Sequence, residues 1–201
     1  MNYDACVAAN RSSLLRVLLV PMLLALLTAC TKVPEGVQPV DGFELQRFLG
    51  KWYEIARLDH GFERNLRNVT AEYVAADGDE IKVINRGYNE KKGEWTEDDA
   101  VAKMLDDPTI GSLKVSFFGP LWGGYHVIAL DKQNYRYAMV TGPSKTLLWI
   151  LSRDKTLDDK VMGDLINQAG KAGYDTKRLI FVKQDDPPAE DTVDAAPAGD
   201  K

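Results

Sequence analysis

The sequence predicts an all-β domain, an eight-stranded antiparallel up-and-down β-barrel with one C-terminal α-helix packed outside and a short final strand. Apolar and aromatic residues recur at every second position in short runs between residues 51 and 152, the period of strands with one buried face. Short segments rich in Gly, Pro, Asp and Asn separate the runs and are typical of turns. None is long enough for the helical crossover that a parallel sheet requires.

The predicted strands follow one another along the chain. They are KWYEIAR, TAEYVA, IKVINRGY, AVAKML, LKVSF, YHVIAL, YRYAMV and LLWILS. An amphipathic helix follows, with a capping box at Thr156 and Asp159 and an end at Gly173. The last strand, LIFV at residues 179–182, is predicted to return to the edge of the sheet.

The N-terminal residues predict export and a lipid anchor. In residues 1–29, two arginines precede an apolar run that ends in small residues, as in a secretory signal peptide. LTAC at residues 27–30 is similar to the bacterial lipobox, in which the Cys thiol receives a lipid and the leader is cleaved before it. Cys30 is therefore the predicted lipid anchor, because several acyl chains give stable attachment to a membrane. Thr31, in place of Asp, favours the outer membrane, facing the periplasm.

The remaining segments flank a barrel predicted for residues 42–184. Residues 30–41 hold two prolines and little apolar periodicity, which predicts an extended tether of roughly 30 Å. Residues 185–201 hold six acids, one Lys and a single large side chain, Val193, a composition typical of disorder. Residues 30–184 carry a formal charge of -1, which argues against nucleic acid as a partner.

Gly50 and Trp52, in GKW at the start of the first strand, and Arg153, directly after the last barrel strand, carry a family resemblance. With the order of the elements, they resemble the lipocalin family. The runs GKWYEIARLDHGFER and VSFFGPLWGGYHVIALD, together with the lipobox, resemble most its apolipoprotein D-like bacterial outer-membrane lipoproteins. The resemblance covers residues 42–184 and implies that Trp52 plugs the closed end of the barrel, with Arg153 stacked across it. The family's Thr-Asp-Tyr motif is only loosely present, in DKQNYRY.

The alternation also predicts which residues face the barrel interior and form a cavity for an acyl chain. The predicted cavity residues are Ala56, Tyr73, Val83, Ala102, Met104, Val115, Phe117, Tyr125, Val127, Tyr137 and Met139. Small residues among them leave space in an eight-stranded barrel. Glu54 shares this face and needs a partner, because an unpaired buried carboxylate is unfavourable. The alternative is a barrel filled by its own side chains.

Connections alternate between the two ends of an up-and-down barrel, and the resemblance implies that the first, third, fifth and seventh surround the open end. The predicted mouth residues are Phe62, Arg64, Arg67, Trp95, Leu121, Trp122 and Lys145. By residue count, the loops carry a formal charge of about +1 at this end and about -5 at the other. We expect the mouth to face the membrane, with its aromatic residues in the headgroup layer.

These features predict a binding protein. Catalysis, metal binding and a cofactor are not expected, because His60 and His126 are the only histidines, Cys30 would be capped by lipid and no catalytic motif is present. The predicted function is that of a lipid-anchored outer-membrane lipocalin that binds fatty acids or lysophospholipids for storage, transport or repair of envelope lipids. One alternative is a structural or protein-interaction lipoprotein with a filled barrel; another is a lipid-modifying enzyme that depends on His60. The sequence leaves homodimer formation through the outer face open.

Overall fold

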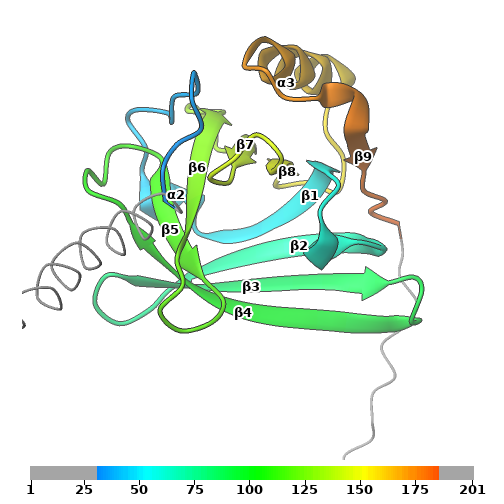
Figure 1. Ribbon diagram of the computed structural model, residues 1–201, viewed down its shortest axis with the longest axis horizontal. Helices are drawn as coiled ribbons and strands as arrows, with labels where there is room; N and C mark the ends of the chain where they lie inside the picture. The colour runs from blue at the N-terminus through cyan, green and yellow to red at the C-terminus, as the bar shows by residue number, and fades with distance from the viewer. Residues whose placement is uncertain (1–30, 186–201) are drawn as a thin grey trace, which may run out of the picture.

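The computed structural model describes residues 31–185, which form an antiparallel barrel with an additional strand beside it (Figure 1). The strands are β1 (Gly50–Leu58), β2 (Leu66–Ala75), β3 (Glu80–Asn89), β4 (Glu94–Met104), β5 (Ser112–Ser116), β6 (Gly123–Leu130), β7 (Tyr137–Thr141), β8 (Leu148–Ser152) and β9 (Leu179–Phe181). They pair in the order β2-β3-β4-β5-β6-β7-β8-β1-β9, and β1 also pairs with β2, which closes an eight-stranded ring. The predicted fold class is confirmed. The predicted leader, Cys30 and the tail from residue 186 onward lie outside the described residues.

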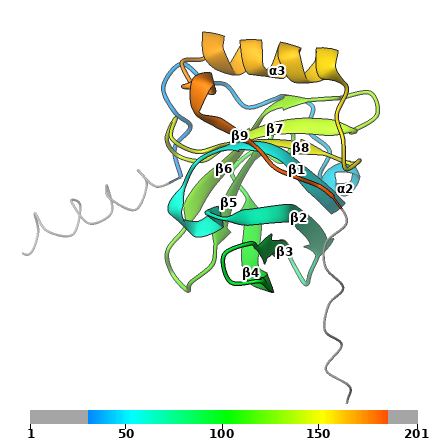
Figure 2. The same cartoon turned by 90° about the vertical axis from the view of Figure 1, so that its right-hand side faces the viewer.

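The main helix, α3 (Asp159–Lys171), lies across the outside of the barrel (Figure 2). Asp158 caps its start, because its carboxylate accepts hydrogen bonds from two backbone N–H groups of the first turn at 3.0 and 3.1 Å. The capping box predicted at Thr156 is therefore wrong by two residues. The predicted end is confirmed, since Gly173 has a φ of +86°, a conformation that glycine adopts readily after a helix. Between residues 31 and 185, no helix is long and apolar enough to cross a bilayer.

Two apolar clusters lie on the two sides of the barrel wall. The interior cluster includes Trp52, Val83 and Leu113. The second cluster lies between the wall and α3 and includes Met139 and Leu165. Strands covered by α3 are therefore apolar on both faces, which matters for predicting which residues face the interior.

One end of the barrel is closed by the short helix α2 (Leu45–Phe48). Phe48 and Trp52 are fully buried, and their ring centroids lie 4.9 Å apart. The Trp52 indole donates a hydrogen bond of 2.8 Å to the Phe48 carbonyl, so no buried donor is left unpaired at this plug. The opposite end carries the odd-numbered connections, including the turn η1 (Gly61–Glu63).

The C-terminal segment seals a seam in the barrel. β1 pairs with β2 only as far as Tyr53, and further along it pairs instead with β9, which follows the turn η2 (Thr176–Arg178). Beyond β9, the Gln184 amide donates hydrogen bonds to the carbonyls of Glu54 (2.8 Å) and Val69 (2.9 Å). Gln184 therefore joins β1 to β2 where they no longer pair directly.

The residues that precede the barrel do not form the free, extended tether that the sequence predicts. The Val40 N–H donates a hydrogen bond to the Val127 carbonyl at 2.8 Å, and Gly111 N–H donates to Val40 at 2.8 Å. The Phe43 N–H donates to Thr109 at 2.8 Å. Residues 31–43, called the N-terminal segment below, are therefore held against the barrel wall.

Candidate functional site

The closed end is organised around Arg153. Its guanidinium carbon lies 3.9 Å from the Trp52 ring centroid, close enough for a cation–π interaction. Its nitrogens also donate to five backbone carbonyls, those of Arg47, Phe48, Leu49 and Lys51 at 2.8 to 3.1 Å and that of Tyr135 at 3.4 Å. One side chain thus fixes both α2 and the start of β1, as the resemblance implies for Trp52 and Arg153.

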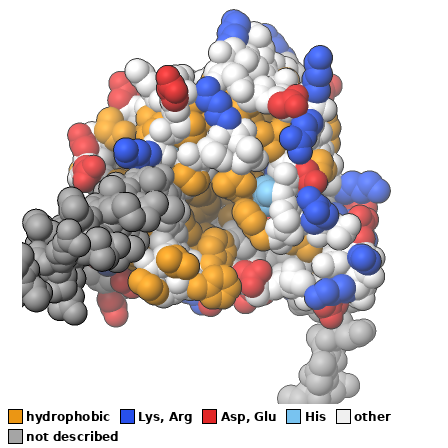
Figure 3. All heavy atoms as spheres, in the orientation of Figure 1, with side chains coloured by type: hydrophobic (Ala, Val, Ile, Leu, Met, Phe, Trp, Pro, Cys, Tyr) orange, Lys and Arg blue, Asp and Glu red, His pale blue; other side chains and the backbone are white. Residues whose placement is uncertain are grey.

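The interior is a cup that opens at the other end. On β5, Leu113 is fully buried, whereas Val115, nearer the mouth, is partly accessible. The same change occurs from Val127 to Tyr125 on β6. Because these side chains belong to the interior cluster or pack against it, their accessibility indicates open space inside the mouth half of the barrel. Figure 3 shows a hollow lined by hydrophobic side chains in the middle of this face.

Most of the predicted cavity residues lie in the interior cluster or against it. These are Tyr73, Val83, Ala102, Met104, Val115, Tyr125 and Val127. Their contact with a ligand remains a prediction. Phe117 differs, because it follows the end of β5 and is 44% exposed, which places it on the rim rather than inside.

For another three residues the prediction of a place in the cavity is wrong. Ala56, Tyr137 and Met139 pack in the cluster beneath α3. In β1, the pairing register with β8 shifts between Glu54 and Ala56, and such a bulge reverses the alternation of side chains. In β7, the interior residues are Ala138 and Val140. The apolar pattern could not distinguish the two faces of β7, because α3 buries the outer one.

The bulge in β1 also turns Arg57 inward, where sequence alternation does not place it. The Arg57 side chain is 2% exposed and donates a hydrogen bond of 2.6 Å to Glu54. It also donates to the carbonyls of Glu63 (2.7 Å) and Leu66 (3.2 Å) in the first mouth connection. Arg57 is thus the partner that the buried Glu54 carboxylate needs, and it ties this carboxylate to the rim.

Glu63 extends this polar network toward the mouth. Its carboxylate accepts a 3.0 Å hydrogen bond from the Trp149 indole and lies 2.9 Å from His60 Nε2. Burial acts to raise the pKa of Glu63, but these two neighbours outweigh it and hold the pKa below its ordinary value. Burial raises the pKa of Glu54 well above its ordinary value, and the Glu63 charge adds to this effect.

A second polar feature of the interior is a tyrosine pair. The hydroxyls of Tyr73 and Tyr125 lie 2.5 Å apart. Burial raises the pKa of both phenols, so both remain neutral. Tyr125 is only partly buried, and its hydroxyl adds a hydrogen-bonding group to the cup besides the network of Glu54, Arg57 and Glu63.

The predicted mouth residues divide by exposure. Phe62 and Leu121 are 63% and 69% exposed. Leu121 belongs to residues 117–122, called the mouth loop below, in which Phe118 is 80% exposed. Phe118 is not among the predicted mouth residues, although the run FFGPLW contains no charged residue. Hydrophobic side chains gather below the hollow in Figure 3.

The other aromatic mouth residues are half-buried. Trp95 packs edge-on against Tyr88, with ring centroids 5.7 Å apart, and Trp122 lies beneath the Lys114 ammonium, 5.0 Å from its ring centroid. Lys145 Nζ lies beside Gly173 at the end of α3, since a Cβ at Gly173 would be 3.1 Å from it. Cations near the C-terminus of a helix interact favourably with its dipole.

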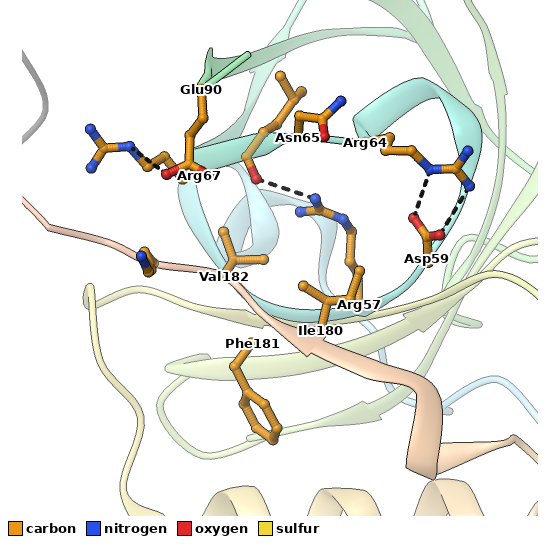
Figure 4. A pocket seen from close by; sticks show the side chains of 11 residues that line it. Arg57, Asp59, Arg64, Asn65, Arg67, Glu90, Ile180, Phe181 and Val182 are labelled. Carbon is orange, nitrogen blue, oxygen red and sulfur yellow. Dashed lines mark hydrogen bonds and ion pairs between the residues drawn. The ribbon is translucent and has the colours of Figure 1, made fainter.

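Arg64 and Arg67 line a cleft of about 310 Å³ beside the seam between β2 and β9 (Figure 4). Arg64 is paired with Asp59 at 2.9 Å. Arg67 lies 3.4 Å from Glu90 and also contacts Asp185. These predicted mouth cations are therefore already neutralised by neighbouring carboxylates.

The described residues contain no metal site of the usual composition. Between residues 31 and 185, His, Cys, Asp and Glu do not form a group of three that could hold a metal ion. His126 is 1% exposed, and its Nδ1 lies 3.0 Å from the Ser112 hydroxyl. Its burial on the wall places it in the packing of the barrel.

Comparison with known proteins agrees with this geometry. A family model described as the Lipocalin-like domain matches residues 43–184. The Outer membrane lipoprotein Blc of Vibrio cholerae is 51% identical over 159 residues, which cover 79% of this chain and 93% of that protein. The protein of the same name from Escherichia coli is 47% identical over 161 residues, covering 79% and 90%.

More distant proteins share the fold. Apolipoprotein D of Macaca fascicularis is 28% identical over 168 residues, which cover 79% of this chain and 84% of that protein. The structure of insecticyanin from the tobacco hornworm Manduca sexta aligns with a TM-score of 0.63 at 23% identity, covering 80% of this chain and 90% of that one. The family model and the bacterial relatives show that this chain belongs to the lipocalin family.

Proposed function

We propose that this lipocalin is a lipid-anchored outer-membrane protein that faces the periplasm and binds fatty acids or lysophospholipids in its barrel. The two bacterial relatives at 51% and 47% identity are named outer membrane lipoproteins, and the lipobox-like LTAC ends at Cys30. Both support the location. Bound lipids would be stored, transported or returned to the envelope.

The change in burial along the interior strands carries the ligand proposal. Leu113 and Val127 are fully buried, whereas Val115 and Tyr125 remain accessible nearer the mouth. A largely apolar cup with one open end fits an acyl chain. Each methylene group that is removed from water stabilises the bound state by about 0.8 kcal/mol. Ala100 and Ala102 on β4 have small side chains that face the interior, which leaves more space for a ligand.

The polar groups support a ligand with a single polar end. The charges of Glu54 and Arg57 are paired with each other within the protein at 2.6 Å, so neither needs a charged group of the ligand as a partner. The polar end of the lipid would therefore lie at the rim. Arg64, Arg67 and Lys145 are the cations there that we propose as partners of an anionic headgroup. The two arginines would exchange their carboxylate partners for the headgroup, and Arg64 is the more exposed of the two, at 59%.

We propose binding rather than catalysis. The candidate catalytic residue, His60, has its Nε2 2.9 Å from the Glu63 carboxylate, and its ring stacks on Phe62 with centroids 3.9 Å apart. Both contacts fit a structural role for His60. The alternative function is an interaction protein with a filled barrel. The accessibility of Val115 and Tyr125 favours lipid binding over this alternative.

Mass spectrometry of the organic extract tests the proposal. Residues 31–201, which contain every element described above, would be expressed without Cys30 and purified gently from bacterial periplasm. We expect a stoichiometric fatty acid or lysophospholipid, and displacement of a bound fluorescent fatty acid by it.

A matched pair of variants separates the two functions. Ala102→Phe adds a large side chain inside the cup, where Ala102 is fully buried, and is expected to weaken fatty acid binding at least tenfold. Val74→Phe makes a similar addition at a residue that is 42% exposed and should bind normally. Equal binding by both variants, or a ligand-free barrel that ignores added fatty acid, would support the interaction protein instead.

A further inference from the structure

The mouth loop exposes a patch of apolar side chains that the described part of the chain, residues 31–185, leaves uncovered. Phe117, Phe118 and Leu121 are 44%, 80% and 69% exposed. Phe62, from η1 at the same end of the barrel, is 63% exposed. Single exposed apolar residues are common on soluble proteins, but several at one end indicate a surface that meets another apolar phase.

The path of the N-terminal segment leads to the same loop. Gly124 is the second residue of β6 and lies two residues after the end of the mouth loop. A Cβ at Gly124 would lie 3.1 Å from the backbone carbonyl carbon of Thr31. The chain therefore leaves the described structure at the mouth end, and consecutive Cα atoms lie only about 3.8 Å apart. Thr31, which follows the predicted anchor residue in the sequence, therefore lies close to the mouth loop.

The charges of the barrel distinguish its two ends. The turn between β2 and β3 exposes Asp77, Asp79 and Glu80, and the connection between β4 and β5 exposes Asp106 and Asp107. These carboxylates lie at the end opposite the mouth. A bilayer surface that contains anionic lipids repels such an end, whereas the uncharged mouth loop can approach it.

We propose that the mouth loop inserts into the headgroup layer of the leaflet that holds the lipid anchor, with Phe118 and Leu121 as the inserted side chains. The occupant of the exposed patch is thus a lipid surface. The barrel then opens directly onto the bilayer, and a lipid enters the cup without crossing water. This inference rests on the proposed attachment at Cys30 for its orientation, but the patch can be tested without the anchor.

Flotation with vesicles of phosphatidylethanolamine and phosphatidylglycerol tests the patch on residues 31–201. We expect the protein to float with the vesicles and the Phe118→Ser/Leu121→Ser variant to bind at least tenfold more weakly. Phe181→Ser is the matched control, because Phe181 is 61% exposed on β9 and its loss should leave vesicle binding unchanged. Binding of a fluorescent fatty acid checks that each variant is folded. An equal loss in the control, or no loss in the double variant, would overturn the proposal.

A site-specific probe gives a second, independent readout. Residues 31–201 contain no cysteine, so Phe118→Cys and Val74→Cys can each carry one environment-sensitive nitrobenzoxadiazole group. On adding vesicles, we expect a blue shift at residue 118 and none at residue 74, which is exposed near the acidic end. A blue shift at residue 118 that instead follows protein concentration without vesicles would show that a second copy of this chain covers the patch, and would overturn the proposal. Failure of either assay leaves fatty acid binding, and hence the proposed function, separately testable.

Discussion

Gly50 holds its backbone directly beneath Arg153, so that a Cβ at residue 50 would lie 3.5 Å from Arg153 Nη1. Its φ of +89° belongs to the left-handed region, which disfavours any residue with a Cβ. We expect Gly50→Ala to lower the free energy of unfolding by about 1–2 kcal/mol, measured by urea denaturation. Gly163→Ala is the control, since Gly163 lies within α3 with nothing within 4 Å of its Cβ position; it should be neutral or stabilising by up to about 1 kcal/mol. Equal effects would contradict this role of Gly50.

Arg153→Lys is expected to lower stability by about 2–4 kcal/mol, because a lysine ammonium cannot stack on Trp52 and reach the five carbonyls at once. Arg136→Lys is the matched control: Arg136 is 67% exposed and paired with Asp154, and its effect should stay within about 0.5 kcal/mol. Thermal denaturation followed by near-ultraviolet circular dichroism measures both. A result in which both variants melt like the parent protein would argue that the closed end needs only a positive charge.

The interior ion pair makes a further prediction. Arg57→Met leaves the Glu54 carboxyl, 4% exposed, without its partner and is expected to cost about 3–5 kcal/mol. Adding Glu54→Leu removes the orphaned group, so the double variant should be more stable than Arg57→Met alone. Urea denaturation of the two single variants and the double variant measures the coupling, and additive effects would contradict it.

His126 predicts a dependence of stability on pH. Burial lowers its pKa in the folded protein, partly opposed by the backbone of Thr31 and Lys32, whereas in the unfolded chain the ring takes up a proton near pH 6.5. The unfolded state thus binds more protons just below this pH, and stability falls as pH drops from about 6.5 toward 5. His126→Gln should lose less stability between pH 7.5 and pH 5 than the parent protein does. An identical loss in both would assign the dependence to other groups.

The close packing of Gly124 against the backbone of Thr31 leads to a prediction about the N-terminal segment. A Cβ at this position would lie 2.6 Å from His126 Nε2 and 3.1 Å from the Thr31 backbone, so Gly124→Ala should displace the segment. Gly123→Ala is the control, because the nearest atom to its Cβ position is 3.9 Å away. Hydrogen exchange at the Val40 N–H, which is bonded to Val127 at 2.8 Å, should accelerate only in Gly124→Ala. Unchanged exchange in that variant would show that the segment is held elsewhere along its length.

The sequence sufficed for the fold because period-two alternation and turn residues are local signals. The contact between Trp52 and Arg153 was predicted from the family resemblance alone. These residues lie about a hundred positions apart, and local sequence patterns do not reveal contacts between such distant residues. Side-chain direction was less predictable. The bulge at Glu54 and Ala56 contains no glycine or proline that would indicate it in the sequence. The inward direction of Arg57 and the packing of Ala56 beneath α3 were therefore not predicted.

Other parts of the site depend on tertiary contacts. Along β7, Tyr137 and Met139 pack beneath α3, whereas Ala138 and Val140 face the barrel interior. Both faces are therefore apolar, and the sequence alone does not show which face is the inner one. Pro34 and Pro39 suggested a free tether, yet backbone hydrogen bonds hold this segment to the wall. Such bonds use the backbone N–H and C=O groups that nearly all residues other than proline carry, and the sequence does not reveal their partners.

Gln184 completes one side of the barrel wall from the far end of the described chain. Its bonds to Glu54 and Val69 join residues separated by 130 and 115 positions, and a contact across so long a loop costs more closure entropy than a local one. β1 and β2 lose their direct pairing beyond Tyr53. A chain cut before Gln184 would therefore lose both of these bonds across the gap between β1 and β2.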